Sequence, residues 1–92
     1  MVFTLTWDEA KRQATLAHRG IDFADAGLVF AGPVFEFEDV RQDYGERRMN
    51  TFGLLSQRMT VVVWTPRGEG RRIISMRYAN ERELAKYAHR MG

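Results

Sequence analysis

Residues 59–77 read MTVVVWTPRGEGRRIISMR, in which two apolar runs flank a loop that contains Pro66, Gly68 and Gly70. β-branched and aromatic residues are common in both runs and favour strands, whereas glycine and proline favour turns. The segment therefore predicts a β-hairpin. Because both faces of each run are largely apolar, we expect central strands that are covered on two sides.

Arg77 comes where the second of these strands ends. A charge that follows a buried strand is held by a rigid scaffold, so it can be aimed at a ligand. Arg77 is therefore the first candidate for a functional side chain. The alternative is an ordinary ion pair with Glu81 or Glu83.

The segments before the hairpin have the patterns of a strand and two helices. Alternation over residues 2–6 predicts a short strand, and Thr6 with Glu9 has the spacing of a capping box, from which a helix should run to about Arg19. A second, shorter helix should begin at Asp22.

Alternation over residues 34–38 predicts a half-exposed strand, with Phe35 and Phe37 on one face and glutamates that protect a sheet edge on the other. A polar loop over residues 39–46 should lead into a further strand over residues 47–55. This strand would turn directly into the central hairpin.

Residues 80–90 predict a terminal helix, since Asn80 and Glu83 have capping spacing. Its inward face should carry three apolar residues, Leu84, Tyr87 and Met91. Strands joined by short turns give an antiparallel meander. The expected class is α+β: a small antiparallel β-sheet with two N-terminal helices and one C-terminal helix, in a single domain over residues 1–92.

Composition argues against several classes of protein. There is no apolar run of about 18 residues and no charged-then-apolar leader, so we expect no membrane span, no contact with a membrane and a cytoplasmic location. The chain has no cysteine, and its two histidines, His18 and His89, are far apart. No zinc spacing is present, so neither a metal nor another cofactor is expected.

Charge is divided unevenly along the chain. Residues 1–46 carry four Lys/Arg against nine Asp/Glu, whereas residues 47–92 carry ten against three. The two halves therefore have net charges of −5 and +7. A basic half favours a polyanion such as nucleic acid or an acidic protein partner, and a solvated surface is the plainer alternative.

Several short motifs, in this order and spacing, resemble the BrnT family of toxins. They are Trp7-Asp8-Glu9-Ala10-Lys11, Gly20-Ile21-Asp22-Phe23 with Ala26, Tyr44-Gly45-Glu46 with Arg48, Val61-Val62-Val63 with Thr65, and Arg72-Ile73-Ile74-Ser75-Met76-Arg77 with Ala79 and Glu83. The resemblance covers nearly the whole chain. It implies a RelE-like fold and a ribonuclease toxin.

The same resemblance implies the partners of such a toxin. They are an RNA substrate, a BrnA-like ribbon-helix-helix antitoxin, and operator DNA only through the antitoxin complex. The chain departs from the family pattern at Thr15, where an asparagine is typical, and at His18-Arg19-Gly20, where Lys-His-Gly is typical. The imidazole is thus moved by one position, or about 100° around a helix.

A ribonuclease can use the 2′-hydroxyl of RNA itself to attack the adjacent phosphate. This reaction requires a base, an acid and fixed positive charge. Arginine can supply the fixed positive charge, and an imidazole, which titrates near neutral pH, can serve as base or acid. Together with the resemblance to the family, this gives four candidate catalytic residues: His18, Arg19, Glu46 and Arg77. Candidate RNA-binding residues are Lys11, Arg48, Arg72 and Tyr78.

Two of these candidates have a plainer explanation. His18 can be a surface or capping residue, and Glu46 can be an ordinary surface ion-pair partner. Trp64 fits the core better than an RNA-stacking role, whereas Tyr78 remains open. The rival functions are a catalytically inactive module that binds RNA or the antitoxin, and a purely structural partner of the antitoxin.

Overall fold

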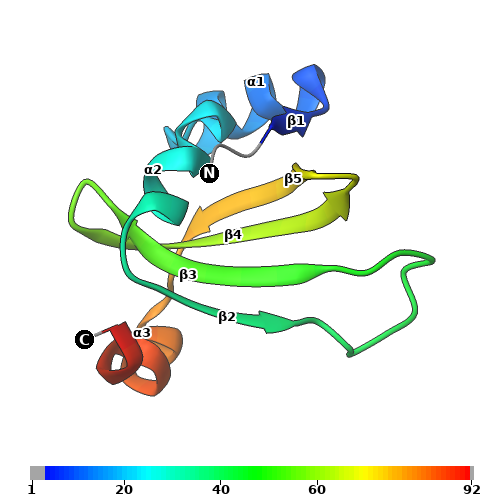
Figure 1. Cartoon of the computed structure of the whole chain (residues 1–92). Helices are drawn as coiled ribbons and strands as arrows, with labels where there is room; N and C mark the ends of the chain where they lie inside the picture. The colour runs from blue at the N-terminus through cyan, green and yellow to red at the C-terminus, as the bar shows by residue number, and fades with distance from the viewer. Residues whose placement is uncertain (1–3, 92) are drawn as a thin grey trace.

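The computed structural model describes residues 4–91. Its central element is a five-stranded sheet with the strand order β1-β5-β4-β3-β2. Helices α1 and α2 lie on one side of the sheet and α3 lies on the other (Figure 1). The strands are β1 (Leu5–Trp7), β2 (Val34–Glu38), β3 (Met49–Leu55), β4 (Arg58–Arg67) and β5 (Gly70–Tyr78). The helices are α1 (Glu9–Arg19), α2 (Ala26–Ala31) and α3 (Glu81–Tyr87), with 3₁₀ turns over Phe23–Asp25 and Ala88–Met91.

The predicted central hairpin is confirmed. Strands β4 and β5 pair antiparallel through a two-residue turn whose Gly68 has a φ of 57°, a left-handed conformation that glycine adopts without strain. Both faces of β4 are buried, since Val61 contacts the α3 side and Val62 the α1–α2 side. Strands β2, β3, β4 and β5 form the expected meander.

The expectation of a purely antiparallel sheet is wrong at the first strand. Strand β1 pairs parallel with β5, so the sheet is mixed. Gly70 permits this contact, because a Cβ there would lie 2.6 Å from the carbonyl oxygen of Thr4, which accepts a hydrogen bond from the backbone N–H of Arg71. Alternation predicts which face a residue occupies but does not specify the partner or direction of a strand. The expected strand residues 2 and 3 lie outside the described part of the chain.

The capping box predicted from Thr6 is also wrong, because Thr6 belongs to β1. The N-cap of α1 is Asp8, whose side chain accepts a hydrogen bond from the backbone N–H of Lys11. The predicted end at Arg19 is confirmed. Asp22 caps a 3₁₀ turn that continues into α2, so the second helix begins near its predicted position.

Two apolar clusters hold the layers together. On the α1–α2 side, Phe23 and Val29 pack with sheet residues such as Met76, and all three are fully buried. On the α3 side, Phe52 and Tyr87 pack together with the other members of that cluster, Met59, Val61, Phe35, Phe37, Val63 and Ala79. Trp64 is buried in the first cluster, which confirms its predicted core role.

Helix α3 begins with the predicted capping box of Asn80 and Glu83. It is shorter than expected and gives way to a 3₁₀ turn after Tyr87. Leu84 is 40% exposed, so its predicted inward position is wrong, whereas Tyr87 faces the sheet. The side chain of Met91 lies outside the described part. Because α3 has only seven residues, it covers one part of its sheet face and leaves the rest open.

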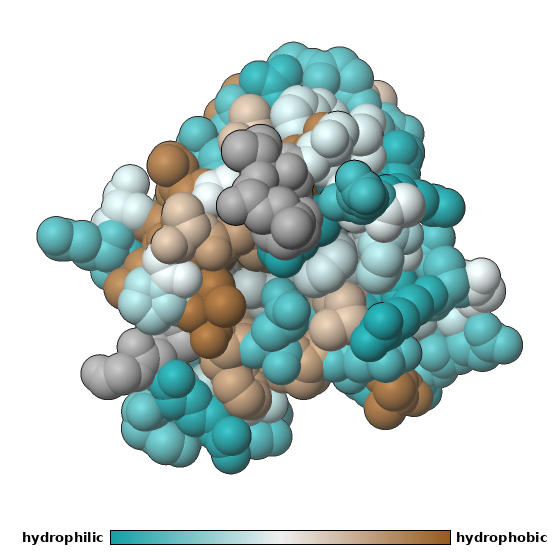
Figure 2. Space-filling view, in the orientation of Figure 1, coloured by the Kyte–Doolittle hydropathy of each residue, from teal (hydrophilic) through white to brown (hydrophobic). Residues whose placement is uncertain are grey.

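Hydrophobic side chains gather on the surface where α2 lies, and hydrophilic colours cover much of the opposite side of this view (Figure 2). Leu28 of α2 and Val34 at the start of β2 are both exposed. Within residues 4–91, no helix is both long enough and apolar enough to cross a membrane.

Candidate functional site

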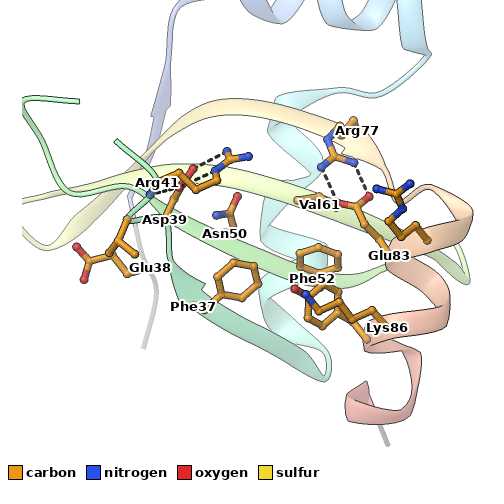
Figure 3. Close-up of a pocket in the computed structure, with 13 residues that line it drawn as sticks. Phe37, Glu38, Asp39, Arg41, Asn50, Phe52, Val61, Arg77, Glu83 and Lys86 are labelled. Carbon is orange, nitrogen blue, oxygen red and sulfur yellow. Dashed lines mark hydrogen bonds and ion pairs between the residues drawn. The ribbon is translucent and has the colours of Figure 1, made fainter. Parts of the chain in front are cut away.

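A pocket of about 420 Å³ opens on the sheet face that α3 partly covers. Strands β2, β3 and β4 supply its floor, which Figure 3 shows from above, with Phe37, Asn50, Phe52 and Val61. Its walls are the segment from Glu38 to Arg41, the side chain of Arg77, and four residues of α3: Arg82, Glu83, Lys86 and Tyr87. The pocket is therefore apolar at the bottom and charged at the rim.

Arg77 is fixed at this rim by Glu83. The guanidinium donates two hydrogen bonds to the carboxylate, with N–O distances of 2.7 and 2.8 Å. Glu83 also accepts a hydrogen bond from the backbone N–H of Asn80, so the capping box of α3 sets the position of the ion pair. Hydrogen bonding to Glu83 raises the pKa of Arg77, and partial burial opposes this. The predicted alternative of an ion pair with Glu83 is confirmed, and the guanidinium keeps further N–H donors for a ligand.

A second arginine lies across the pocket on the loop between β2 and β3. The carboxylate of Asp39 is buried and accepts hydrogen bonds from the backbone N–H and guanidinium of Arg41 and from the hydroxyl of Tyr44. Arg41 holds the pKa of Asp39 far below its ordinary value. The charge of Arg41 acts on Arg77 and slightly opposes its protonation, so both cations belong to one electrostatic site.

Asp39→Asn should reduce the free energy of unfolding by about 1–2 kcal/mol at pH 7, because buried hydrogen bonds to a charged acceptor are lost. The pKa of Asp39 is depressed by folding, so its stabilisation is present above the ordinary carboxyl range and is lost as pH falls toward the folded pKa. Urea unfolding of both proteins should therefore show a stability gap that narrows below about pH 4. A gap that is unchanged at low pH would mean that the carboxylate charge does not anchor this loop.

Of the other predicted site residues, Arg72 shares the sheet face of Arg77, and Glu46 and Arg48 lie on the segment between β2 and β3. None of these three is among the described residues that line the Arg77 pocket. Arg72 lies opposite Thr65, on the face that also carries Val61 and Arg77. Glu46 forms ion pairs with Arg67 at 3.0 Å and with Arg48 at 3.5 Å, as its plainer explanation expects. The guanidinium of Arg48 stacks on the ring of Tyr44, which connects this group to Asp39 and the pocket.

The remaining predicted residues lie elsewhere. Lys11, His18 and Arg19 line a separate groove of about 390 Å³ between α1 and β5, beside Ile74 and Ser75. Arg19 donates a hydrogen bond to the carbonyl oxygen of Met76, which fixes the end of α1 to β5. Among the described residues, none lines both this groove and the Arg77 pocket. Tyr78 packs against the α1–α2 cluster, with Arg58 stacked on its ring.

Besides Glu38 and Asp39, which were expected only in a strand and a polar loop, sequence reasoning missed four polar or charged residues of the pocket: Asn50, Arg41, Arg82 and Lys86. Alternation in β3 contains a signal for Asn50, because it is two residues from Phe52 and so shares its face. The other three have no signal, since exposed Lys and Arg side chains are common. Among residues 4–91, no group of three or more His, Cys, Asp or Glu side chains is arranged to hold a metal ion.

Comparison with known families gives a match over most of the chain. A sequence model described as "Ribonuclease toxin, BrnT, of type II toxin-antitoxin system" matches residues 7–83. The chain belongs to this family. No match was found among curated proteins.

A solved structure agrees with the BrnT assignment. The chain is 30% identical to the ribonuclease toxin BrnT of Brucella abortus, whose crystal structure superposes with a TM-score of 0.63 over 87% of this chain and all of the other. The predicted family and α+β class are thus confirmed. As a BrnT toxin of a type II system, the protein has a cognate antitoxin as its partner.

Proposed function

We propose that this BrnT protein cleaves RNA at the Arg77 pocket by attack of the substrate's own 2′-hydroxyl on the adjacent phosphate. The observation that carries the proposal is the bidentate Arg77–Glu83 pair at the rim of a pocket that also has Arg41. Guanidinium groups held in a fixed geometry stabilise charge that develops on a phosphorane, and this route needs no metal ion.

The charged residues divide into two roles. Arg77 and Arg41 would neutralise the reacting phosphate, while Arg82, which has no carboxylate partner within residues 4–91, would contact a flanking phosphate. Hydrogen bonds from the arginines lower the pKa values of Asp39 and Glu83. These two carboxylates therefore stay ionised and orient arginines, which leaves proton transfer to another group.

Two predicted residues are candidates for proton transfer. Glu46 lies on the segment between β2 and β3 that also carries Arg41, and its ion pairs with Arg48 and Arg67 hold it there. His18 has an imidazole, a side chain that can act as either acid or base, but it lies in the α1 groove. We therefore propose Glu46 for the Arg77 pocket and keep His18, with Lys11 and Arg19, as a candidate that reaches RNA along the outer edge of β5.

The biological consequence of the proposal is inhibition of translation through cleavage of messenger RNA. We further propose that a ribbon-helix-helix antitoxin neutralises the toxin by covering this basic face, and that the pair meets operator DNA only through the antitoxin. The net charge of +7 over residues 47–92 supports an acidic or polyanionic partner.

The test uses a purified chain, excess chelator and an RNA oligonucleotide, with a second substrate in which 2′-O-methyl groups replace the hydroxyls. We expect cleavage of the first substrate only, with 2′,3′-cyclic phosphate or 3′-phosphate ends. In the same assay Glu46→Gln and His18→Ala identify the proton-transfer group as the one whose loss slows cleavage at least about tenfold, or 1.4 kcal/mol. Cleavage of the methylated substrate would contradict the proposed chemistry.

The second candidate function is a binding module without catalysis. The observation that favours it is the separation of His18 from the Arg77 pocket, in a chain whose Thr15 and His18-Arg19 depart from the pattern typical of the family. RNA that is bound but left intact under all conditions would decide for this function.

A further inference from the structure

Asn50 lies in the middle of the pocket floor, between the Arg41–Asp39 pair and the Arg77–Glu83 pair (Figure 3). It is half-buried, and its carboxamide forms no hydrogen bond with any other residue in the described part of the chain. Side-chain amides carry donors and acceptors that are normally satisfied when they are buried. An amide that is held on a central strand without a partner is therefore available to a ligand.

The neighbours of Asn50 explain why a protein partner is missing. On the adjacent strands, Phe37 lies directly opposite on β2 and Val63 on β4. Both pack against the apolar cluster on the α3 side and offer no hydrogen bond. Phe37 is half-buried, and its ring lies 5.8 Å from that of Tyr87, so aromatic surface continues from Asn50 toward α3.

We propose that this part of the pocket binds one base of single-stranded RNA and that Asn50 reads the edge of that base. The inference rests on the proposed function, because it assigns a substrate contact next to the phosphate site at Arg77. A base has an apolar face that packs on aromatic rings and an edge with hydrogen-bonding groups. The apolar floor suits the face, and the unpartnered carboxamide suits the edge.

The charges around the pocket distinguish a base from other occupants. Arg41 and Arg77 sit at the rim and would contact the reacting phosphate beside the base, while the floor itself carries no charge. An anionic group placed on the floor would meet only the neutral amide and rings of Phe37 and Phe52. A nucleotide unit puts its neutral part on the floor and its charged part at the rim.

The hydrogen-bonding groups of the Asn50 amide predict how substitutions at this position should change base preference. A carboxamide presents one donor and one acceptor side by side and forms paired hydrogen bonds with a base edge that offers the complementary pair. A carboxylate is acceptor-only, so Asn50→Asp should favour guanine, whose Watson–Crick edge offers two adjacent donors. Asn50→Leu keeps the shape of the side chain and removes both groups.

The test measures binding, so that it does not depend on cleavage. Fluorescence anisotropy is recorded with short oligonucleotides of abasic spacers that carry a single A, C, G or U. The wild type should rank the four bases, with about a tenfold range in affinity, and Asn50→Leu should reduce the range to about twofold or less. Asn50→Asp should move guanine up the ranking. The matched control is Gln13→Leu, which removes an amide on α1 that pairs with Glu9.

The possible results separate this inference from the proposed function. No ranking in the wild type, or the same ranking in Asn50→Leu, overturns the base subsite even where RNA is cleaved. A ranking that depends on Asn50 in a protein that cleaves no RNA establishes the subsite and rejects the ribonuclease mechanism at Arg77.

Discussion

Arg77→Ala is expected to slow RNA cleavage about 100-fold to 1000-fold, the loss that follows when one preorganised donor to a developing anion is removed. The guanidinium is held by two hydrogen bonds that it donates to Glu83, and it lies at the rim of the pocket. Its removal takes away fixed charge that water cannot replace in the same geometry. The measurement is the single-turnover cleavage rate of an RNA oligonucleotide.

The fold should survive this substitution. The Arg77 side chain is 39% exposed, and ion pairs of this kind contribute under about 1 kcal/mol to stability. Glu83 also keeps its hydrogen bond to the backbone of Asn80. The matched control is Arg58→Ala, which removes the same charge from a residue stacked on Tyr78 on the other face of the sheet. Equal loss of cleavage in both variants would mean that net charge, and not the Arg77 pocket, determines activity.

Phe23→Ala should have the largest effect on stability, a loss of about 3–5 kcal/mol in the free energy of unfolding. The Phe23 side chain has no exposed surface and packs between the N-terminal helical layer and the sheet. A domain of this size has about 5–15 kcal/mol in total, so thermal unfolding should move down by about 15 °C or more. Differential scanning calorimetry or circular dichroism would record the shift.

Leu28→Ala is the matched control for Phe23→Ala. It removes an apolar side chain from α2, the helix that follows Phe23, but Leu28 is 64% exposed. The expected change is within about 0.5 kcal/mol. If both substitutions lowered the melting temperature equally, the helical layer would not depend on Phe23 as its anchor.

Much of the fold could be predicted because local patterns agree with the tertiary structure. The Asn80–Glu83 spacing, the two apolar runs of the hairpin and the alternation of Phe35 and Phe37 all predicted elements that the structure confirms. The direction of β1 could not be predicted, since a three-residue strand contains no information about its partner. Its pairing depends on the free edge of β5 and on the absence of a side chain at Gly70.

The site was harder to predict because a β-bulge decides which side chains meet. Val63 pairs with Ser75 and Trp64 with Ile73, so Ile74 is an extra residue in β5. Uninterrupted alternation from the buried Ile73 would place Arg77 on the α1–α2 side. The extra residue turns Arg77 to the α3 side, away from the groove that His18 lines. Nothing in the sequence marks this bulge.

The two hydrogen-bonding tasks of Glu83 restrict how this toxin can evolve. One carboxylate completes the cap of α3 and also orients Arg77. A substitution there alters helix stability and guanidinium geometry together. Under the function proposed for the Arg77 pocket, selection for weaker or stronger toxicity through this position therefore carries a change in folding with it. Arg82 and Lys86 are exposed at the same rim and take no part in the cap, so under the same proposal substitutions there would change potency without changing the stability of α3.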